Sequence, residues 1–463
     1  MKLNYFNFKK MENQIMMTND FGNFLFVSES EFKDILHGKI EPNSDIEKKL
    51  LDHKMIYRES DLEFSSTYMY DIRSLKQHVN MATSLHIFVV TTACNMNCVY
   101  CQANNGKKCS DLYMTADIAK KAVDIALESP TRYLTFEFQG GEPLLNFDIV
   151  KYIVEYTEEK NESHVINFNI VTNLTLFTEE MIEFFKEHKF GISTSLDGPE
   201  ILHNKNRAFR NGQGTYAKVV ESLQKLRAAG LYVGAIETTT RESLLYPKEL
   251  ARTYAKLGFE SIFVRPLTPL GKATVNWEEI GYTPEEFIKF YKSVMMELIQ
   301  INLEGSYIKE DHTAILLNRI CGDFVNYMEL RSPCGAGIGQ LAYYADGNIF
   351  TCDEGRMLYE MGDATFCLGN VFESNYQNVI NNGVCRTVCA SSMLETLPSC
   401  CDCVYQPYCG TCPVVNYAGS ADVIEKSPRG YRCKIYTGIL DFIFEQFLKD
   451  EKIIMNVFDK WRC

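Results

Sequence analysis

The first 93 residues of this chain contain no cysteine, although the whole sequence has 17. Three cysteines fall between residues 94 and 101, and twelve fall between residues 334 and 463. In a small secreted protein so many cysteines would indicate disulfides, but the opening MKLNYFNFKKMENQ lacks the apolar core of a signal peptide. We therefore expect a cytoplasmic protein whose clustered thiols bind metal.

Long apolar runs are also missing. No stretch approaches roughly twenty consecutive apolar residues, so no membrane span is predicted. The net charge of −13 argues against a general binder of nucleic acid or of an anionic membrane surface. The sequence has no internal repeat, and its 46% apolar and 23% charged residues are ordinary for a globular protein. A length of 463 residues favours two or three domains.

Residues 1–80 mix strand and helix patterns. Leu3–Phe8 alternates weakly, and Phe24–Val27 reads as a strand. Ser28, with Glu31 three residues later, caps one predicted helix, and a second helix, Asp45 to His53, can begin after a serine cap. Two strands and two helices predict a small winged-helix-like module. The alternative is an N-terminal extension that only packs on the main domain.

Strands and helices alternate from residue 85 to about residue 270. The six predicted strands are Leu85–Val90, Leu134–Phe138, Ile166–Thr172, Gly191–Ser195, Tyr232–Glu237 and Ser261–Arg265. The helical patterns between them include Thr115–Glu128, Thr178–Glu187, Tyr216–Ala229 and Pro247–Leu257. Such an order indicates a parallel sheet with right-handed crossovers, and ligands of such sheets bind at the carboxyl ends of the strands. A further amphipathic helix is predicted over Ile439–Phe447.

The first cysteine cluster directly follows the first of these strands. Cys94, Cys98 and Cys101 have the spacing C-x3-C-x2-C. Three thiolates can hold three corners of an iron–sulfur cube and leave the fourth iron open to another ligand. The alternative is a zinc loop, which normally uses four ligands in paired C-x2-C units. A position at the carboxyl end of a strand favours the cluster.

A second cysteine array occupies the C-terminal third. Cys334 is followed by Gly347 and then by Cys352. Further on, four cysteines have the spacing C-x2-C-x5-C-x2-C, and one more cysteine, Cys433, follows them. The members after Cys352 are Cys400, Cys403, Cys409, Cys412 and Cys433. Zinc is again the competing interpretation, because C-x2-C pairs are its usual ligands.

With the motifs GGEP at residues 140–143 and SLDGP at residues 195–199, the cysteine loop resembles the radical S-adenosylmethionine (radical SAM) superfamily. The resemblance implies a partial (β/α)6 barrel and a [4Fe–4S] cluster on Cys94, Cys98 and Cys101. The open iron would chelate S-adenosylmethionine. An electron from the cluster would then break the sulfonium bond, leaving a 5′-deoxyadenosyl radical that abstracts a substrate hydrogen.

The same resemblance assigns roles in binding S-adenosylmethionine. Glu142 would accept a hydrogen bond from the ammonium group, Arg207 would pair with the carboxylate, Ser195 would contact the ligand, and Tyr100 would contact the adenine. Further contacts are expected from Gly141, Asn173 and Leu267. The alternative for the GGEP motif is a simple Gly-Pro turn. The alternative for Asn173 and Leu267 is that each is an ordinary turn or core residue.

The second array resembles the SPASM extension, which holds two auxiliary [4Fe–4S] clusters. The resemblance implies that Cys334, Cys352 and Cys412 ligate the first and that Cys400, Cys403, Cys409 and Cys433 ligate the second. The first set is one ligand short: either Cys321 completes it, or the site is open to substrate. Cys401 is an alternative to its neighbour Cys400. We expect Cys109, Cys367, Cys385, Cys389 and Cys463 to be small apolar residues without a metal.

Four longer strings sharpen the resemblance to the radical SAM maturases of the His-Xaa-Ser peptide system. They are MTNDFGNFLF (17–26), EFQGGEPLLNF (137–147), STSLDGP (193–199) and YYADGNIFTCDEGRML (343–358). The resemblance implies a leader-recognition module (1–80), a radical SAM barrel (81–275), a helical bridge (276–333) and a SPASM domain (334–463). The implied partners are a precursor peptide with a leader and an electron donor such as flavodoxin or ferredoxin.

Two carboxylates follow Cys352 directly. Asp353 or Glu354 could take a proton from the substrate, and the alternative is a solvated, salt-bridged turn. The expected reaction is a side-chain crosslink of thioether, carbon–carbon or ether type. The alternatives are epimerisation, the oxidation of Cys or Ser by a sulfatase-maturing enzyme, and a zinc or iron–sulfur scaffold without activity.

Overall fold

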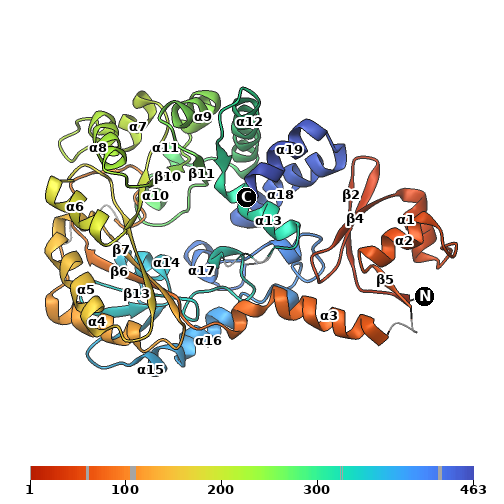
Figure 1. Ribbon diagram of the computed structural model, residues 1–463, viewed down its shortest axis with the longest axis horizontal. Coiled ribbons are helices and arrows are strands. Elements are labelled where there is room, and N and C mark those ends of the chain that lie inside the picture. Colours follow the sequence, from red (N-terminus) through yellow and green to blue (C-terminus); the bar gives the residue numbers. More distant parts are fainter. Residues whose placement is uncertain are drawn as a thin grey trace.

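The computed structural model describes residues 2–58, 62–104, 111–323, 325, 327–425 and 430–462. Figure 1 shows the barrel strands and helices α4 to α9 at one end of the molecule and the N-terminal module at the other. The C-terminal helices α18 (Tyr431–Lys449) and α19 (Lys452–Trp461) lie between them. Within the described part of the chain, no helix combines the length and apolar character needed to cross a membrane.

The central sheet has ten strands in the order β12-β11-β10-β9-β8-β7-β6-β13-β14-β15. All six predicted strands are present and pair in parallel with their neighbours, which confirms the partial (β/α)6 barrel. They are β6 (Leu85–Thr91), β7 (Tyr133–Gly140), β8 (Val165–Val171), β9 (Gly191–Ser195), β10 (Val233–Thr238) and β11 (Ser261–Arg265). The mostly apolar β6 is buried because helices cover the parallel sheet.

The predicted barrel helices also form, and their first residues explain where they begin. The side chains of Thr115 and Thr178 each accept a hydrogen bond from a backbone N–H in the first turn of the following helix. The helices are α4 (Ala116–Leu127), α5 (Phe147–Lys160), α6 (Glu179–Glu187), α7 (Glu200–Asn206), α8 (Tyr216–Ala228) and α9 (Pro247–Lys256). Short 3-10 turns lie at Gln77–Asn80, Pro143–Asn146 and Ser243–Leu245.

The C-terminal region is joined to the barrel sheet. Strand β13 (Gln340–Tyr343) pairs in parallel with β6, and β14 (Asn348–Phe350) and β15 (Cys367–Asn370) continue the sheet as antiparallel strands. At the other edge β12 (Lys309–Glu310) pairs with β11. The cysteine-rich segment therefore lies against the first barrel strand, next to the loop that carries the first three cysteines.

Helices fill the remaining connections. The segment after β11 contains α10 (Lys272–Val275), α11 (Trp277–Ile280), α12 (Pro284–Leu303) and α13 (Asp311–Ile320). The cysteine-rich region adds α14 (Asp353–Glu360), α15 (Tyr376–Ile380), α16 (Gly383–Ala390) and α17 (Pro413–Ser420), with 3-10 turns at Met328–Leu330, Leu394–Thr396 and Gln406–Tyr408. The last predicted helix is longer than expected, because α18 starts eight residues earlier and includes Cys433.

The N-terminal module differs from the sequence prediction in its strands. The expected strand over residues 3–8 is wrong, because this segment contributes to two different sheets. Strand β1 (Lys2–Leu3) pairs with β5 (Ile56–Tyr57), whereas β2 (Asn7–Met11) belongs to the three-stranded sheet. A third strand, β3 (Gln14–Thr18), was not predicted. It lies between β2 and β4 (Phe24–Ser28) and is buried on both faces, so it shows no apolar–polar alternation.

The predicted caps of the module's helices are confirmed. Ser28 and Glu31 form a capping box at the start of α1 (Glu29–Leu36), and the Ser44 hydroxyl accepts from a backbone N–H at the start of α2 (Asp45–Asp52). A long helix not predicted from the sequence, α3 (Leu62–Leu75), then runs from the module toward the barrel (Figure 1).

Candidate functional site

The GGEP motif packs directly on the backbone of the first cysteine loop. The N–H of Gly141 donates to the carbonyl of Thr91 (2.8 Å), and the N–H of Glu142 donates to the carbonyl of Ala93 (2.7 Å). A Cβ atom on Gly141 would lie 2.2 Å from the Ala93 oxygen. Only glycine allows this approach, so the motif fixes the loop in place and is more than a simple turn.

Glu142 ties the ends of two barrel strands together. Its side chain is buried, and it accepts hydrogen bonds from the N–H of Leu144 (3.1 Å), the hydroxyl of Thr172 (2.7 Å) and the N–H of Asn173 (2.7 Å). Burial raises the pKa of the Glu142 carboxyl to about 7, because its hydrogen bonds offset only part of the desolvation. A cationic group bound beside it would favour the ionised form.

The three thiols of the first loop lie in a buried environment. The side-chain amide nitrogen of Asn173 is 4.0 Å from the Cys94 sulfur, and the N–H of Met96 donates to the same sulfur (3.4 Å). Burial raises the pKa of Cys94 to about 12 and that of Cys101 to about 11, and it also raises the pKa of Cys98. Three cysteine sulfurs from one short loop are the kind of donor set that holds an iron–sulfur cluster.

A buried polar triad lies behind the third cysteine. The Tyr100 hydroxyl donates to the Asp197 carboxylate (2.8 Å), and Nη1 of Arg207 donates to the same hydroxyl (2.8 Å). Nε of Arg207 is buried and has no partner among the described residues. The guanidinium therefore keeps a donor for an anionic ligand, as the resemblance requires. The role of Asp197 was not predicted, although the SLDGP string contained it.

Two other expected contacts lie at the ends of strands. Ser195 is the last residue of β9, and Leu267 follows β11, is buried and donates its N–H to the Tyr282 hydroxyl (2.6 Å). Beyond Leu267 the chain passes over the cysteine loop at Gly271, whose φ is 58°. A Cβ atom there would lie 2.5 Å from the Cys101 carbonyl oxygen. The carboxyl ends of the strands thus surround the first three cysteines.

The first auxiliary set lines a cavity of about 470 Å³. Cys334 belongs to the segment before β13, Cys352 precedes α14, and Cys412 precedes α17. These three cysteines face the cavity together with residues from the carboxyl ends of barrel strands, including Glu137 and Gln139 from β7. The structure therefore brings Cys334, Cys352 and Cys412 to one cavity, whose other wall is formed by the barrel strands.

A charged network that was not predicted from the sequence forms part of the cavity wall. The Glu329 carboxylate accepts hydrogen bonds from Arg265 (2.8 Å), Arg432 (3.1 Å) and the Tyr436 hydroxyl (2.9 Å). Burial alone would raise the Glu329 pKa, but the two guanidinium groups lower it below its ordinary range. Nothing in the local spacing marks these residues, because they come from separate segments of the chain.

The two carboxylates after Cys352 also line the cavity but differ in their partners. Asp353 accepts from Nε of Arg356 (2.7 Å), and the buried Arg356 also donates to the Gln139 side chain (3.2 Å). Asp353 is therefore anchored to the barrel through Arg356. Burial raises the pKa of the Glu354 carboxyl. The ion pair of Asp353 with Arg356 is one that the alternative interpretation, a salt-bridged turn, also predicts, and both carboxylates face the cavity.

The second auxiliary set is also gathered in space. Burial raises the pKa of Cys409 to about 12, and the charges of Cys403, Cys433 and Cys400 add to this effect because the four thiols are close. Cys401, the alternative ligand, instead acts on Tyr5 of the N-terminal module. The structure therefore favours Cys400 over Cys401 as a member of this set.

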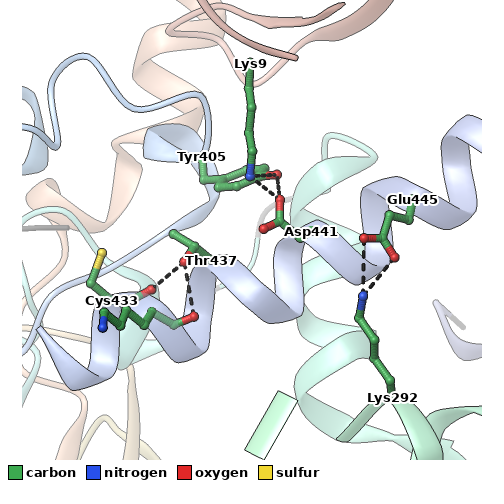
Figure 2. A network of polar contacts seen from close by, with 8 residues as sticks. Lys9, Lys292, Tyr405, Cys433, Thr437, Asp441 and Glu445 are labelled. Carbon is green, nitrogen blue, oxygen red and sulfur yellow. Dashed lines mark hydrogen bonds and ion pairs between the residues drawn. The ribbon is translucent and has the colours of Figure 1, made fainter. Parts of the chain in front are cut away.

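The N-terminal module contacts this second set directly. Figure 2 shows Nζ of Lys9 beside the hydroxyl of Tyr405 (3.4 Å) and the carboxylate of Asp441. Asp441 lies on α18, the helix that carries Cys433, and Tyr405 lies in the loop between Cys403 and Cys409. The module is thus fixed to both segments that supply the second auxiliary set.

The cysteines without an assigned role fall in several environments. Cys385 is buried, Cys367 and Cys389 are half-buried, and Cys109 and Cys463 lie outside the described residues. Cys321 is exposed at the end of α13 and does not line the cavity. Among the described residues, no three His, Cys, Asp or Glu side chains converge on one point as a single ion requires. In a cubane each thiolate binds a different iron, so its ligands are spread more widely.

Comparisons with known proteins identify the barrel. Residues 88–257 match the Radical SAM superfamily. The uncharacterized protein MJ0907 of Methanocaldococcus jannaschii is 33% identical over 186 residues, which is 40% of this chain and 63% of that relative. The cysteine-type anaerobic sulfatase-maturating enzyme of Clostridium novyi is 22% identical over 333 residues, which is 70% of this chain and 86% of that enzyme.

Solved structures share the fold over a longer part of the chain. Native anSMEcpe with bound AdoMet has a TM-score of 0.67 at 20% identity and covers 81% of this chain and 99% of its own. Streptococcus suis SuiB bound to precursor peptide SuiA has a TM-score of 0.55 at 16% identity and covers 92% of this chain and 97% of its own. Residues 88–257 are therefore identified as a radical SAM domain, the catalytic domain of enzymes that use a [4Fe–4S] cluster and S-adenosylmethionine, and the loop of Cys94, Cys98 and Cys101 lies within it.

Proposed function

We propose that this enzyme matures a ribosomally made precursor peptide and that its product carries a side-chain crosslink of thioether, carbon–carbon or ether type. The observation that carries the proposal is the cavity of about 470 Å³ between the barrel and the first auxiliary set of cysteines. A space of this size accepts a few side chains of an extended segment. A folded protein domain would not enter it.

The cavity reaches from the first cysteine loop to the auxiliary cysteines. Gln102 follows Cys101 directly and lines the cavity, and Gln139 lines it just before the GGEP motif. Cys334 and Cys412 line the cavity as well. A substrate side chain bound here would therefore lie between the site of hydrogen abstraction and a cluster able to accept the electron released on oxidation.

The chain's own residues would hold S-adenosylmethionine next to this cavity. The cluster, when bound, supplies the electron that breaks the sulfonium bond and so generates the radical that abstracts hydrogen. Arg207 offers its free Nε to the carboxylate, and Glu142 offers its carboxylate to the ammonium group. Ser195, Asn173 and the backbone of Gly141 stand at the same ends of the strands. Tyr100 is proposed to contact the adenine, and its hydroxyl accepts a hydrogen bond from Arg207.

Proton removal from the substrate is proposed for the carboxylates after Cys352. Asp353 lines the cavity and is oriented by Arg356, which in turn contacts Gln139 of the barrel. A positioned carboxylate within reach of a substrate proton is the requirement for a general base. Glu354, the second candidate, lines the same cavity.

The N-terminal module is proposed to bind the leader of the precursor peptide. Its three-stranded sheet has the order β2-β3-β4, so β4 pairs with β3 on one side alone within the described residues. An extended peptide can add to such an edge through main-chain hydrogen bonds. The likeness to SuiB, whose structure holds its precursor peptide, extends over 92% of this chain. Flavodoxin or ferredoxin is proposed as the electron donor.

The substrate is proposed to be a peptide of the His-Xaa-Ser type, on the strength of the four sequence strings. The second candidate function is sulfatase-type oxidation of a Cys or Ser, favoured by the match to the Clostridium novyi enzyme. Epimerisation is a further outcome of the same hydrogen abstraction. The N-terminal sheet favours the peptide substrate, because a module that can add a strand serves to capture a leader.

Anaerobic reconstitution followed by dithionite and S-adenosylmethionine tests the radical reaction through the release of 5′-deoxyadenosine. The substrate is tested by coexpression with short peptides encoded beside this gene, followed by mass spectrometry. A loss of two hydrogens without a new aldehyde indicates a crosslink, and an unchanged mass with altered stereochemistry indicates epimerisation. A product that reacts with a hydrazide probe indicates the sulfatase-type reaction instead.

The leader function is tested with the same peptide lacking its leader. We expect the modification to be lost, whereas an unchanged rate would contradict leader capture. Iron at about twelve per chain is expected for three [4Fe–4S] clusters. Stoichiometric zinc with no 5′-deoxyadenosine would instead support the scaffold interpretation.

A further inference from the structure

The first auxiliary set supplies three thiols, whereas a [4Fe–4S] cube has four iron corners. Cys334, Cys352 and Cys412 all line the cavity. Cys321 does not complete them: it is exposed at the end of α13, and the nearby charges that act on it belong to Arg462 and two aspartates. A fourth donor, if the protein supplies one, must come from the wall of the cavity.

Glu354 lines the same cavity as all three cysteines. It is the second residue of α14, and Cys352 caps that helix by accepting from the N–H of Gly355 (3.4 Å). Cys334, Cys352 and Cys412 pack in one cluster. Glu354 follows Cys352 by two residues and faces the cavity that all three cysteines share.

Other carboxylates on the cavity wall are already engaged. Asp353 is held by Arg356, and Glu329 is held by Arg265, Arg432 and Tyr436. Glu137 accepts from the side chain of Gln139 (2.6 Å).

Glu354, by contrast, has no hydrogen bond or ion pair to another described residue, and its one hydrogen bond is to its own backbone. This half-buried carboxylate faces the cavity and is available to a ligand there. Carboxylate oxygens are ordinary ligands of iron in proteins.

We propose that the Glu354 carboxylate is the fourth ligand of the first auxiliary cluster. The assignment rests on the proposed function, because it requires that Cys334, Cys352 and Cys412 hold a [4Fe–4S] cluster. It separates the two neighbouring carboxylates by role: Glu354 binds iron, and Asp353, fixed by Arg356, remains for the proton of the substrate.

The test uses the full chain with Cys94, Cys98 and Cys101 replaced by alanine, so that only auxiliary clusters remain. The protein is produced with ¹³C-carboxylate glutamate, reconstituted, reduced and examined by electron–nuclear double resonance. We expect a ¹³C hyperfine coupling on one auxiliary cluster that disappears in Glu354→Gln. Glu354→Cys is expected to retain the iron, to lose the coupling and to shift the g-values. Glu360→Gln, on the same helix but outside the cavity, should leave the coupling unchanged.

Two results would overturn the assignment in distinguishable ways. If the chain holds about eight irons but shows no ¹³C coupling, or keeps the coupling in Glu354→Gln, the clusters exist and Glu354 is not a ligand. If the iron content is well below eight and Cys334→Ala does not lower it further, the first auxiliary cluster itself is absent. That second result would remove the support for the proposed function as well.

Discussion

The side-chain amide of Asn7 donates hydrogen bonds to the backbone carbonyls of Cys401 (3.1 Å) and Cys403 (3.2 Å). Asn7 is the first residue of β2 in the N-terminal module, whereas Cys403 belongs to the second auxiliary set. A single side chain thus connects the proposed leader-binding sheet with the loop that would hold an iron–sulfur cluster. The Thr18 hydroxyl adds a third bond, to the carbonyl of Val404 (2.7 Å).

Replacement of Asn7 by alanine should loosen this loop. Two carbonyls would each lose one of their donors, and we expect the free energy of unfolding to fall by about 1–2 kcal/mol. We also expect the second auxiliary cluster to lose iron faster in air. Denaturant unfolding and the rate of iron release measure the two effects. Asn211→Ala, an exposed asparagine in a distant loop, is the control. Equal iron release in both variants would contradict the coupling.

Replacement of Gly141 by alanine should displace the first cysteine loop. The new Cβ would lie 2.2 Å from the Ala93 carbonyl oxygen, and only a backbone shift relieves this overlap. We expect a loss of about 1–3 kcal/mol in stability and a fall in iron bound to the first cluster. Gly383→Ala is the matched control, because no atom lies within 4 Å of the place that its new Cβ would take. Full iron content and full 5′-deoxyadenosine formation in Gly141→Ala would refute this account.

Arg207→Lys should weaken the binding of S-adenosylmethionine. Lysine keeps the positive charge but lacks the planar guanidinium group. In Arg207, Nη1 of this group donates to the Tyr100 hydroxyl, and Nε has no partner among the described residues. We expect the Kd of the cluster-loaded enzyme to rise by about 10- to 100-fold, which equals roughly 1.4–2.8 kcal/mol. Equilibrium dialysis under anaerobic conditions measures it. Arg252→Lys, on helix α9 in an ion pair with Glu297 of α12, should leave the Kd unchanged.

The binding of S-adenosylmethionine should also depend on pH through Glu142. Burial raises the pKa of this carboxyl to about 7, so the free enzyme holds a proton there below that pH. An ammonium group prefers the ionised carboxylate, and binding then releases the proton. Affinity should therefore fall as the pH decreases below about 7, by at most about tenfold per pH unit.

The control for this prediction is Glu142→Gln, which removes the titrating group. Its affinity should be lower at about pH 8 and nearly independent of pH down to about pH 6. An identical pH profile in the two proteins would show that another group is responsible. Thr172 and Asn173, which hold Glu142 in place, remain unchanged in the variant and keep the comparison local.

Much of the barrel was predictable because its signals are local. Most predicted strands are short segments rich in apolar residues and followed by polar ones, and several helix starts carry their own cap, as at Thr115 and Thr178. The N-terminal sheet was less predictable. Strand β3 is covered on both faces, so no apolar–polar alternation marks it, and two of its five residues are methionine.

By itself, the sequence determined the number and spacing of the cysteines and therefore the three groups of thiols, since ligand spacing along a loop is a property of the chain. It also determined the glycines of the GGEP motif. Only the tertiary structure decided which carboxylate is free: Asp353 and Glu354 are neighbours in sequence, but Arg356 engages the first alone. The network of Glu329 with Arg265 and Arg432 likewise exists only in the fold, because segments far apart in the sequence meet there.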